Sequence, residues 1–129
     1  MVNNLLADSI SWIKNGYTSK LSSVSLIKSN FLIQVIDLLY KEGYFRSYHL
    51  RIQNQITVNL KYNINNMSVI QNLKLVSRPS QEVHCSYLDL LYLTVYNNGI
   101  FIISTSKGLM SSMEAIKQKC GGKVLLYIV

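Results

Sequence analysis

Apolar residues recur at helical spacing in the first third of this chain. One stripe, with steps of three or four residues, predicts an amphipathic helix and consists of Leu6, Ile10, Ile13 and Tyr17. A broader apolar surface follows Asn30 and stops at Gly43, which predicts a second, mostly buried helix. The segment between the two helices, residues 23–27, is a candidate strand.

Between residues 48 and 62 apolar residues recur at every second position, which predicts β-strands. Apolar side chains alternate with polar ones in two runs, first at Tyr48, Leu50 and Ile52 and then at Ile56, Val58, Leu60 and Tyr62. Asn54 and Gln55 separate the runs. This arrangement predicts a hairpin with one polar face, on which Arg51 and Lys61 lie.

Residues 63–68, NINNMS, have no periodicity and are rich in turn formers. We therefore predict two subdomains, residues 1–64 and 65–129. In the second subdomain the pattern predicts a turn at 78–80, a short helix at 113–119, and strands at 72–76, 83–87, 100–103 and 123–129. A further helix is predicted from the apolar residues Leu88, Leu91, Tyr92 and Val95.

The charges of the chain are few and mostly positive. Hydrophobic residues make up 49% and charged residues 15%, and the formal net charge is +7. Such an excess in a chain with a core favours an anionic partner, either nucleic acid or a lipid surface. The most apolar region, residues 88–103, is interrupted by polar residues, so it lacks the roughly 20 apolar residues of a membrane span.

Neither a metal site nor a cofactor site is predicted. Cys85 and Cys120 are far apart, without the spacing of zinc ligands, and His49 and His84 form no helical pair. The thiols are therefore interpreted as structural or incidental. We also find no acid–base pair or nucleophile group, so no catalytic residue and no small-molecule substrate are expected.

One polar stretch, STSKG at residues 104–108, directly follows the predicted buried strand at 100–103. It matches neither a phosphate-binding loop nor a nucleophile elbow. Two interpretations remain. Its hydroxyls could simply cap the following helix. Alternatively, a rigid loop presents hydroxyls to RNA, with Lys107 as a charge for phosphate and Gly108 allowing close backbone approach.

Several short motifs, in the same order along essentially the whole chain, resemble those of a known protein family. They are LADSIS (6–11), IKNG (13–16), KEGYFRSY (41–48), LKY (60–62), VSRP (76–79), GIFIISTSKGLM (99–110) and GGKVLLYIV (121–129). With them the chain resembles the universal eighth protein of the small ribosomal subunit, in its bacterial and organellar form. The resemblance implies an α/β (α+β) fold with an α-β-α-β-β N-terminal half and a mostly β C-terminal half with short helices.

The resemblance also implies a function. Members of the family are structural constituents of the small subunit, where they bind an irregular helix in the central domain of the rRNA and help to assemble the platform for translation. The expected partners are this rRNA and neighbouring small-subunit ribosomal proteins. The expected RNA-binding residues are the loop residues Ser104, Thr105, Ser106, Lys107 and Gly108, together with Lys14, Asn15, Ser77 and Arg78.

The chain departs from the family after Pro79. A glycine and a basic strand are usual there, but this chain has Ser80 and then QEVHCSYLDLLY, which is nearly uncharged or acidic. Phosphate contacts expected from this strand are therefore absent, and its surface is expected to meet a neighbouring protein. The alternative function is accordingly an assembly component held mainly by protein contacts, with reduced rRNA binding.

Two observations suggest where the protein acts. Asn, Ser, Ile and Tyr are abundant and Lys is favoured over Arg, as in AT-rich genomes. The family-like residues begin at about position 5, which leaves no room for an import presequence. We therefore expect an organelle-encoded protein in the ribosome of the mitochondrial matrix, with a plastid or a bacterial cytoplasm as the alternatives.

Overall fold

The computed structural model describes residues 2–77, 81–97 and 99–129, and the turn predicted at 78–80 lies outside the described residues. The chain forms two compact units, Met1–Gln71 and Asn72–Val129. The sequence pattern divided the chain after residue 64. The first unit extends further because the chain folds back there, with Ser68 bridged to Tyr62 and Val69 donating its N–H to the Lys61 carbonyl at 3.2 Å.

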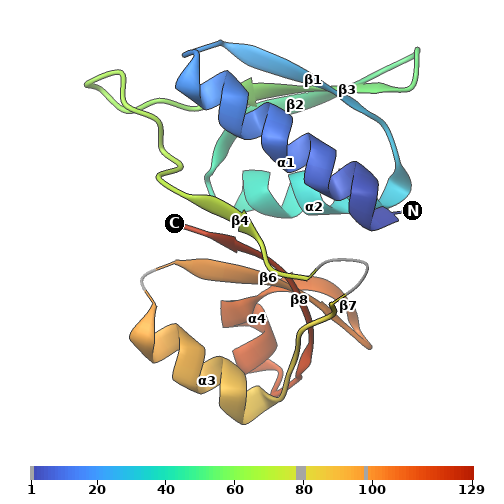
Figure 1. Cartoon of the computed structure of the whole chain (residues 1–129), viewed down its shortest axis with the longest axis vertical. Coiled ribbons are helices and arrows are strands. Elements are labelled where there is room, and N and C mark those ends of the chain that lie inside the picture. Colours follow the sequence, from blue (N-terminus) through green and yellow to red (C-terminus); the bar gives the residue numbers. More distant parts are fainter. Residues whose placement is uncertain (1, 78–80, 98) are drawn as a thin grey trace. The chain divides into compact units, whose positions relative to one another are not determined.

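Both units combine helices with strands (Figure 1). The first unit contains α1 (Val2–Thr18), β1 (Ser23–Ile27), α2 (Asn30–Lys41), β2 (Phe45–Arg51) and β3 (Gln55–Leu60). The second contains β4 (Leu73–Leu75), β5 (His84–Cys85), α3 (Tyr87–Tyr96), β6 (Ile100–Thr105), β7 (Gly108–Ser111), α4 (Ser112–Lys117) and β8 (Gly122–Ile128). The mixed fold class expected from the sequence is confirmed.

The first unit packs two helices on an antiparallel sheet with the strand order β1-β3-β2. Figure 1 shows both helices on the same face of this sheet. The apolar stripe predicted for α1 is confirmed, because its members are all buried: Leu6, Ile10, Ile13 and Tyr17. Helix α2 begins at Asn30, where the Ser29 hydroxyl caps it by accepting the Leu32 N–H at 3.1 Å.

A buried tyrosine ties α1 to the strands beside it. The Tyr17 hydroxyl donates to the Tyr44 carbonyl at 3.0 Å and accepts the Lys61 N–H at 3.3 Å. Burial raises the pKa of Tyr17 to about 12, so the neutral phenol persists at physiological pH. This anchor keeps one side of α1 on the sheet and leaves the opposite side, with Lys14 and Asn15, exposed.

The β2–β3 hairpin is confirmed, but its apolar residues are buried unequally. Leu50 and Ile56 are register partners, yet Ile56 is 0% exposed and Leu50 is half exposed. The difference follows from strand order, since β3 is central in the sheet and β2 is an edge strand. Ile52 lies in the turn and is fully exposed, so its predicted place on a buried strand face is wrong.

The second unit is built around β8, the central strand of its sheet. The strand order is β4-β8-β6-β7, and β5 also pairs with β8. Helices α3 and α4 pack on each other, and α4 packs on β6. The core between these elements contains Leu90, Phe101, Ile103, Met110, Ala115 and Val124. The predicted buried strand at 100–103 is confirmed, whereas β7 was not predicted.

Helix α3 is present as predicted, but with a different buried face. Leu90 is its buried residue and Leu93 packs against the same core. Leu88, Tyr92 and Val95, which the periodicity assigned to the apolar face, are exposed. The helix is apolar on nearly every side, so spacing alone could not select the face that the sheet covers.

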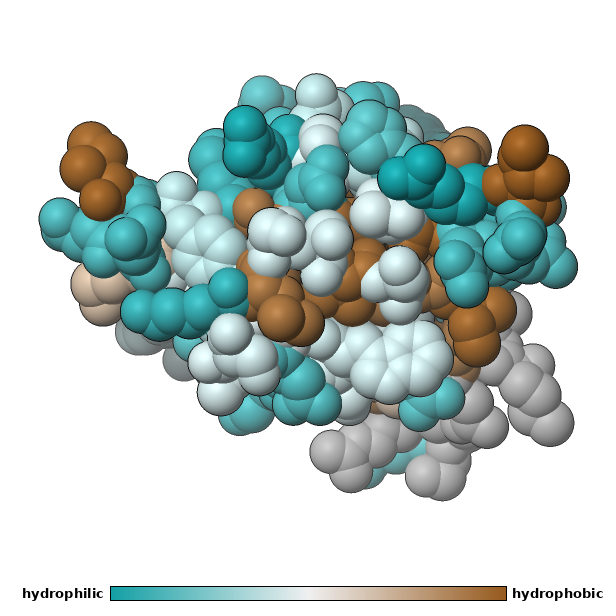
Figure 2. Space-filling model, turned by 90° about the horizontal axis from the view of Figure 1, so that it is seen from above, coloured by the Kyte–Doolittle hydropathy of each residue, from teal (hydrophilic) through white to brown (hydrophobic). Residues whose placement is uncertain are grey.

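Two features relate to membrane contact: the length and apolar character of the helices, and the polarity of the surface. None of the described helices combines the length and the apolar character that a bilayer crossing requires. On the face drawn in Figure 2, hydrophilic and intermediate residues predominate, with hydrophobic residues between them and at the edges. Hydrophobic residues scattered in this way are normal on protein surfaces.

Two isoleucines of the same hairpin test this burial pattern. Replacing the fully buried Ile56 with Ala is expected to lower the free energy of unfolding by about 2–5 kcal/mol. The smaller side chain leaves a cavity, and the packing contacts of the removed atoms are lost. Ile52→Ala, at the exposed turn, is expected to stay within about 0.5 kcal/mol of the parent chain. Urea denaturation measures both, and similar losses for the two variants would contradict the assigned core.

Candidate nucleic-acid interface

The STSKG stretch forms the turn of the β6–β7 hairpin. Thr105 and Gly108 are register partners, and Ser106 and Lys107 form the tip between them. The Thr105 hydroxyl closes the turn, since it accepts the Lys107 N–H at 3.1 Å and donates to the Gly108 carbonyl at 2.9 Å. Gly108 has φ +113°, a conformation that side-chain-bearing residues rarely adopt. The loop is therefore held in one shape by its own backbone and by one hydroxyl.

The other two hydroxyls of the loop are free. Within the part of the chain that the structure describes, neither Ser104 nor Ser106 has a side-chain hydrogen bond, and Ser106 and Lys107 are exposed. The interpretation as a helix cap is wrong, because a strand follows the loop. Helix α4 is capped instead by Ser111, whose hydroxyl accepts the Glu114 N–H at 3.3 Å.

The sheet places two further polar residues in a row with the base of the hairpin. Ser104 is the register partner of Lys123 on β8, and Lys123 is in turn the partner of His84 on β5. Cross-strand partners project from the same face of a sheet, so these three side chains form a row. Gly122 makes the close pairing possible, since a Cβ there would collide with the Ser104 carbonyl oxygen.

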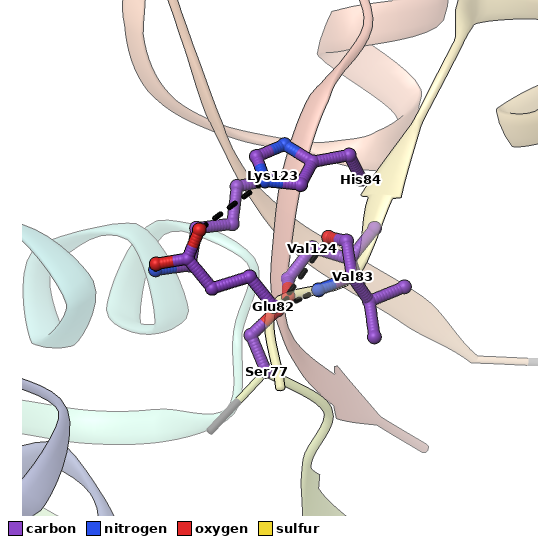
Figure 3. Close-up of polar contacts among 6 residues, drawn as sticks. All are labelled: Ser77, Glu82, Val83, His84, Lys123 and Val124. Atoms are coloured by element: carbon purple, nitrogen blue, oxygen red, sulfur yellow. Dashed lines mark hydrogen bonds and ion pairs between the residues drawn. The ribbon is translucent and has the colours of Figure 1, made fainter. Parts of the chain in front are cut away.

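An acidic residue reaches this row of side chains. Figure 3 shows the Glu82 carboxylate directed toward Lys123 and His84, with distances of 3.1 Å to Lys123 Nζ and 3.3 Å to His84 Nε2. Hydrogen bonds first from Lys123 and then from His84 hold the pKa of Glu82 below its usual value. Lys123 and His84 were missed because only strand register reveals that Lys123 lies next to Ser104 and that His84 lies on the far side of Lys123.

Ser77 has a structural position. It is 1% exposed, its hydroxyl donates to the Val124 carbonyl, and the same oxygen accepts the Val83 N–H at 3.0 Å (Figure 3). Because its side chain is buried and its hydroxyl is already engaged, Ser77 supports the segment beside β8, and this geometry does not support its predicted RNA contact. Arg78 lies outside the described residues.

Lys14 and Asn15 form a separate group in the first unit. Both are exposed on α1, next to Thr18, whose hydroxyl donates to the Lys14 carbonyl at 2.9 Å. Of the predicted site residues that the structure describes, Lys14 and Asn15 lie on α1, residues 104–108 form the turn of the β6–β7 hairpin, and Ser77 is buried beside β8. The described residues contain no group of three or more His, Cys, Asp or Glu side chains that could hold a metal ion, and both cysteines are free thiols.

Comparisons with known proteins agree with the motif resemblance. Residues 4–129 match the family model described as Ribosomal protein S8. Small ribosomal subunit protein uS8m of Acanthamoeba castellanii is 36% identical over 126 residues, which cover 97% of this chain and 98% of that protein. Small ribosomal subunit protein uS8 of Rickettsia typhi is 40% identical over 129 residues, which cover 97% of this chain and 96% of that protein.

Replacing Ser77 with Ala is expected to lower the free energy of unfolding by about 1–3 kcal/mol. The substitution removes the hydroxyl that pairs with the buried Val124 carbonyl and with the partly buried Val83 N–H. Ser106→Ala is the matched control, since its exposed hydroxyl has no partner to lose. Chemical denaturation compares them, and equal stabilities would mean that the Ser77 hydroxyl is not a structural link.

The ion pairs of Glu82 predict a pH dependence. A carboxyl whose pKa is lower in the folded chain than in the unfolded chain stabilises the fold above its unfolded pKa, and this contribution disappears as pH falls through the folded pKa. Lys123→Gln is expected to raise the pKa of Glu82 toward its ordinary value. NMR titration of the side-chain carboxyl measures this shift. Lys117→Gln should leave the midpoint unchanged, and an unchanged midpoint in Lys123→Gln would contradict the pairing.

Proposed function

The chain belongs to the ribosomal protein S8 family, and we propose that it binds an irregular helix in the central domain of the small-subunit rRNA through its β6–β7 hairpin. Membership of this family makes the chain a structural, non-enzymatic component of the small ribosomal subunit. One observation carries the proposal. The hairpin holds, in a turn that is already fixed, an exposed lysine and two serine hydroxyls that have no partner among the described residues.

The chemistry of the hairpin suits RNA. A serine hydroxyl both donates and accepts, as does the ribose 2′-hydroxyl, and irregular helices present base edges together with 2′-hydroxyls. Ser104 and Ser106 would make these contacts, and Lys107 would pair with a phosphate. Because the Thr105 hydroxyl already holds the turn, little conformational entropy is lost when RNA binds.

The remaining site residues have supporting roles in this proposal. Lys14 and Asn15 on the exposed side of α1 would contact the RNA backbone, and Arg78 would add a phosphate contact. Ser77 holds the segment that leads to Arg78 but does not itself reach RNA. The net charge of +7 would accelerate encounter with the rRNA without selecting its sequence.

The bound chain would help to organise the platform of the subunit during assembly, next to other small-subunit proteins. Its setting would be the mitochondrial ribosome. The uS8m relative supports this placement, whereas the rickettsial uS8 relatives support the bacterial alternative.

A second candidate function rests on the distribution of charge. No Lys or Arg occurs between Arg78 and Lys107, a stretch that includes β5, α3 and β6. Phosphate contacts from these elements are therefore few. In this alternative, protein neighbours provide most of the attachment and the hairpin contributes only weakly to RNA binding.

The double variant Ser104→Ala/Ser106→Ala is expected to lose about 1–3 kcal/mol of specific binding, since each neutral hydrogen bond contributes about 0.5–1.5 kcal/mol. Its salt dependence should match that of the parent chain, because no charge is removed. Equilibrium binding to a central-domain fragment of small-subunit rRNA, measured over a salt series, gives both quantities.

Two control variants sharpen this experiment. Ser22→Ala/Ser25→Ala removes two exposed hydroxyls from the first unit and should bind RNA like the parent chain. Lys107→Gln should reduce the slope of log K against log salt by about 0.7–0.9, as expected for one lost phosphate contact. If the parent chain and the Ser104/Ser106 variant bind equally weakly, the hairpin does not recognise RNA. The result would then favour the alternative in which protein neighbours provide most of the attachment.

A further inference from the structure

Helix α3 carries an exposed apolar face that lies outside the hydrophobic core formed by the described residues. This α3 face consists of Leu88, Tyr92, Val95 and Tyr96, which are 70%, 64%, 79% and 70% exposed. Their spacing of four, three and one residues places them on one side of the helix. The rings of Tyr92 and Tyr96 contact each other, with centroids 4.5 Å apart, so the face is continuous over its C-terminal half.

The helix is anchored without this face. Ser86 and Asp89 form a capping box at its start, with both hydrogen bonds at 3.3 Å. Leu90 and Leu93 attach the opposite side to the core of the second unit. Folding therefore does not require large apolar side chains at the four exposed positions. Their clustering on one side suggests that they serve an interaction.

The charge around the α3 face argues against RNA as its occupant. Between Arg78 and Lys107 the chain has no Lys or Arg and two acids, Glu82 and Asp89. A surface without cations gains nothing from counterion release, which supplies most of the affinity for phosphates. Asp89 and the partially negative C-terminal end of α3 next to Tyr96 instead complement a positively charged segment.

The size of the α3 face limits what can occupy it. A helix of 10 residues is about 15 Å long, and one side of it covers far less than the roughly 1,200–2,000 Å² of a stable independent complex. A second copy of the chain would thus find too little area to form a dimer. The contact becomes useful when both partners are already held on the same RNA, where the effective concentration is high.

We propose that the α3 face binds a basic segment with an apolar stripe from a neighbouring protein of the small ribosomal subunit. This inference rests on the proposed function only in that the shared rRNA brings the partner close. The aromatic pair Tyr92 and Tyr96 provides the anchor, since buried aromatic residues contribute strongly to interfaces. The rim of the contact is formed by Asp89 on this chain and by Lys or Arg on the partner.

Site-specific cross-linking tests the occupant directly. Tyr92→p-benzoylphenylalanine is introduced into the full chain, which is assembled into small ribosomal subunits and then irradiated. We expect a cross-link to a peptide of another ribosomal protein, with Lys or Arg next to apolar residues, identified by mass spectrometry. The same probe at the exposed Tyr40 of α2 controls for non-specific cross-linking.

A charge variant adds a quantitative readout. Val95→Lys is expected to fold normally, because the side chain is exposed, and to lower retention in salt-washed subunits about tenfold, as for the loss of one interface anchor. Its binding to the isolated rRNA fragment should equal that of the parent chain. The hairpin variant Ser104→Ala/Ser106→Ala should instead bind the isolated fragment more weakly, so binding to the fragment distinguishes failure of one proposal from failure of the other.

Several outcomes would overturn the inference. A cross-link from position 92 to rRNA would make the α3 face an RNA surface, and one to a second copy would make it a dimer contact. Absence of any cross-linked product in assembled subunits would mean that the face remains in solvent. Unchanged retention of Val95→Lys would likewise show that no partner depends on it.

Discussion

The antiparallel pairing of β6 with β8 is the interaction on which the candidate site depends. It requires very close backbones, because Cβ atoms at Gly99 and Gly122 would collide with the carbonyl oxygens of Ile128 and Ser104. Once the strands are paired, Ser104 lies next to Lys123 and the hairpin tip projects beyond the sheet. The same β8 also holds β4 and β5, so a single strand organises the whole second unit.

The second unit carries two surfaces with different chemistry. The β6–β7 hairpin is small, polar and positively charged at Lys107. The α3 face consists of large apolar side chains and contains no Lys or Arg. Both are rigidly supported, the first by the hydroxyl of Thr105 and the second by a capping box and the core beneath Leu90. In the proposed function the hairpin meets RNA and the α3 face meets protein, and separating these chemistries lets each surface exclude the wrong partner.

Local patterns were good predictors wherever one face of an element was clearly more apolar than the other. The α1 stripe of Leu6, Ile10 and Ile13 is buried as its spacing indicated. The β2–β3 hairpin formed where apolar residues begin to alternate with polar ones. Prediction failed where the pattern had no contrast, as in α3, whose side chains are apolar almost all round. It also failed at Ile52, because strand alternation does not reveal where the turn begins.

The sequence by itself determined the family, the order of helices and strands up to Ile103, and the hydroxyl-rich loop at 104–108, because these depend on local spacing and contiguous motifs. Only the tertiary structure decided that this loop is a hairpin turn, that Thr105 holds it, and that Ser77 is a buried link. It also placed Lys123 between Ser104 and His84 and turned Tyr92 and Val95 outward. These features depend on strand register and on which face the core covers, which are contacts between residues far apart in the chain.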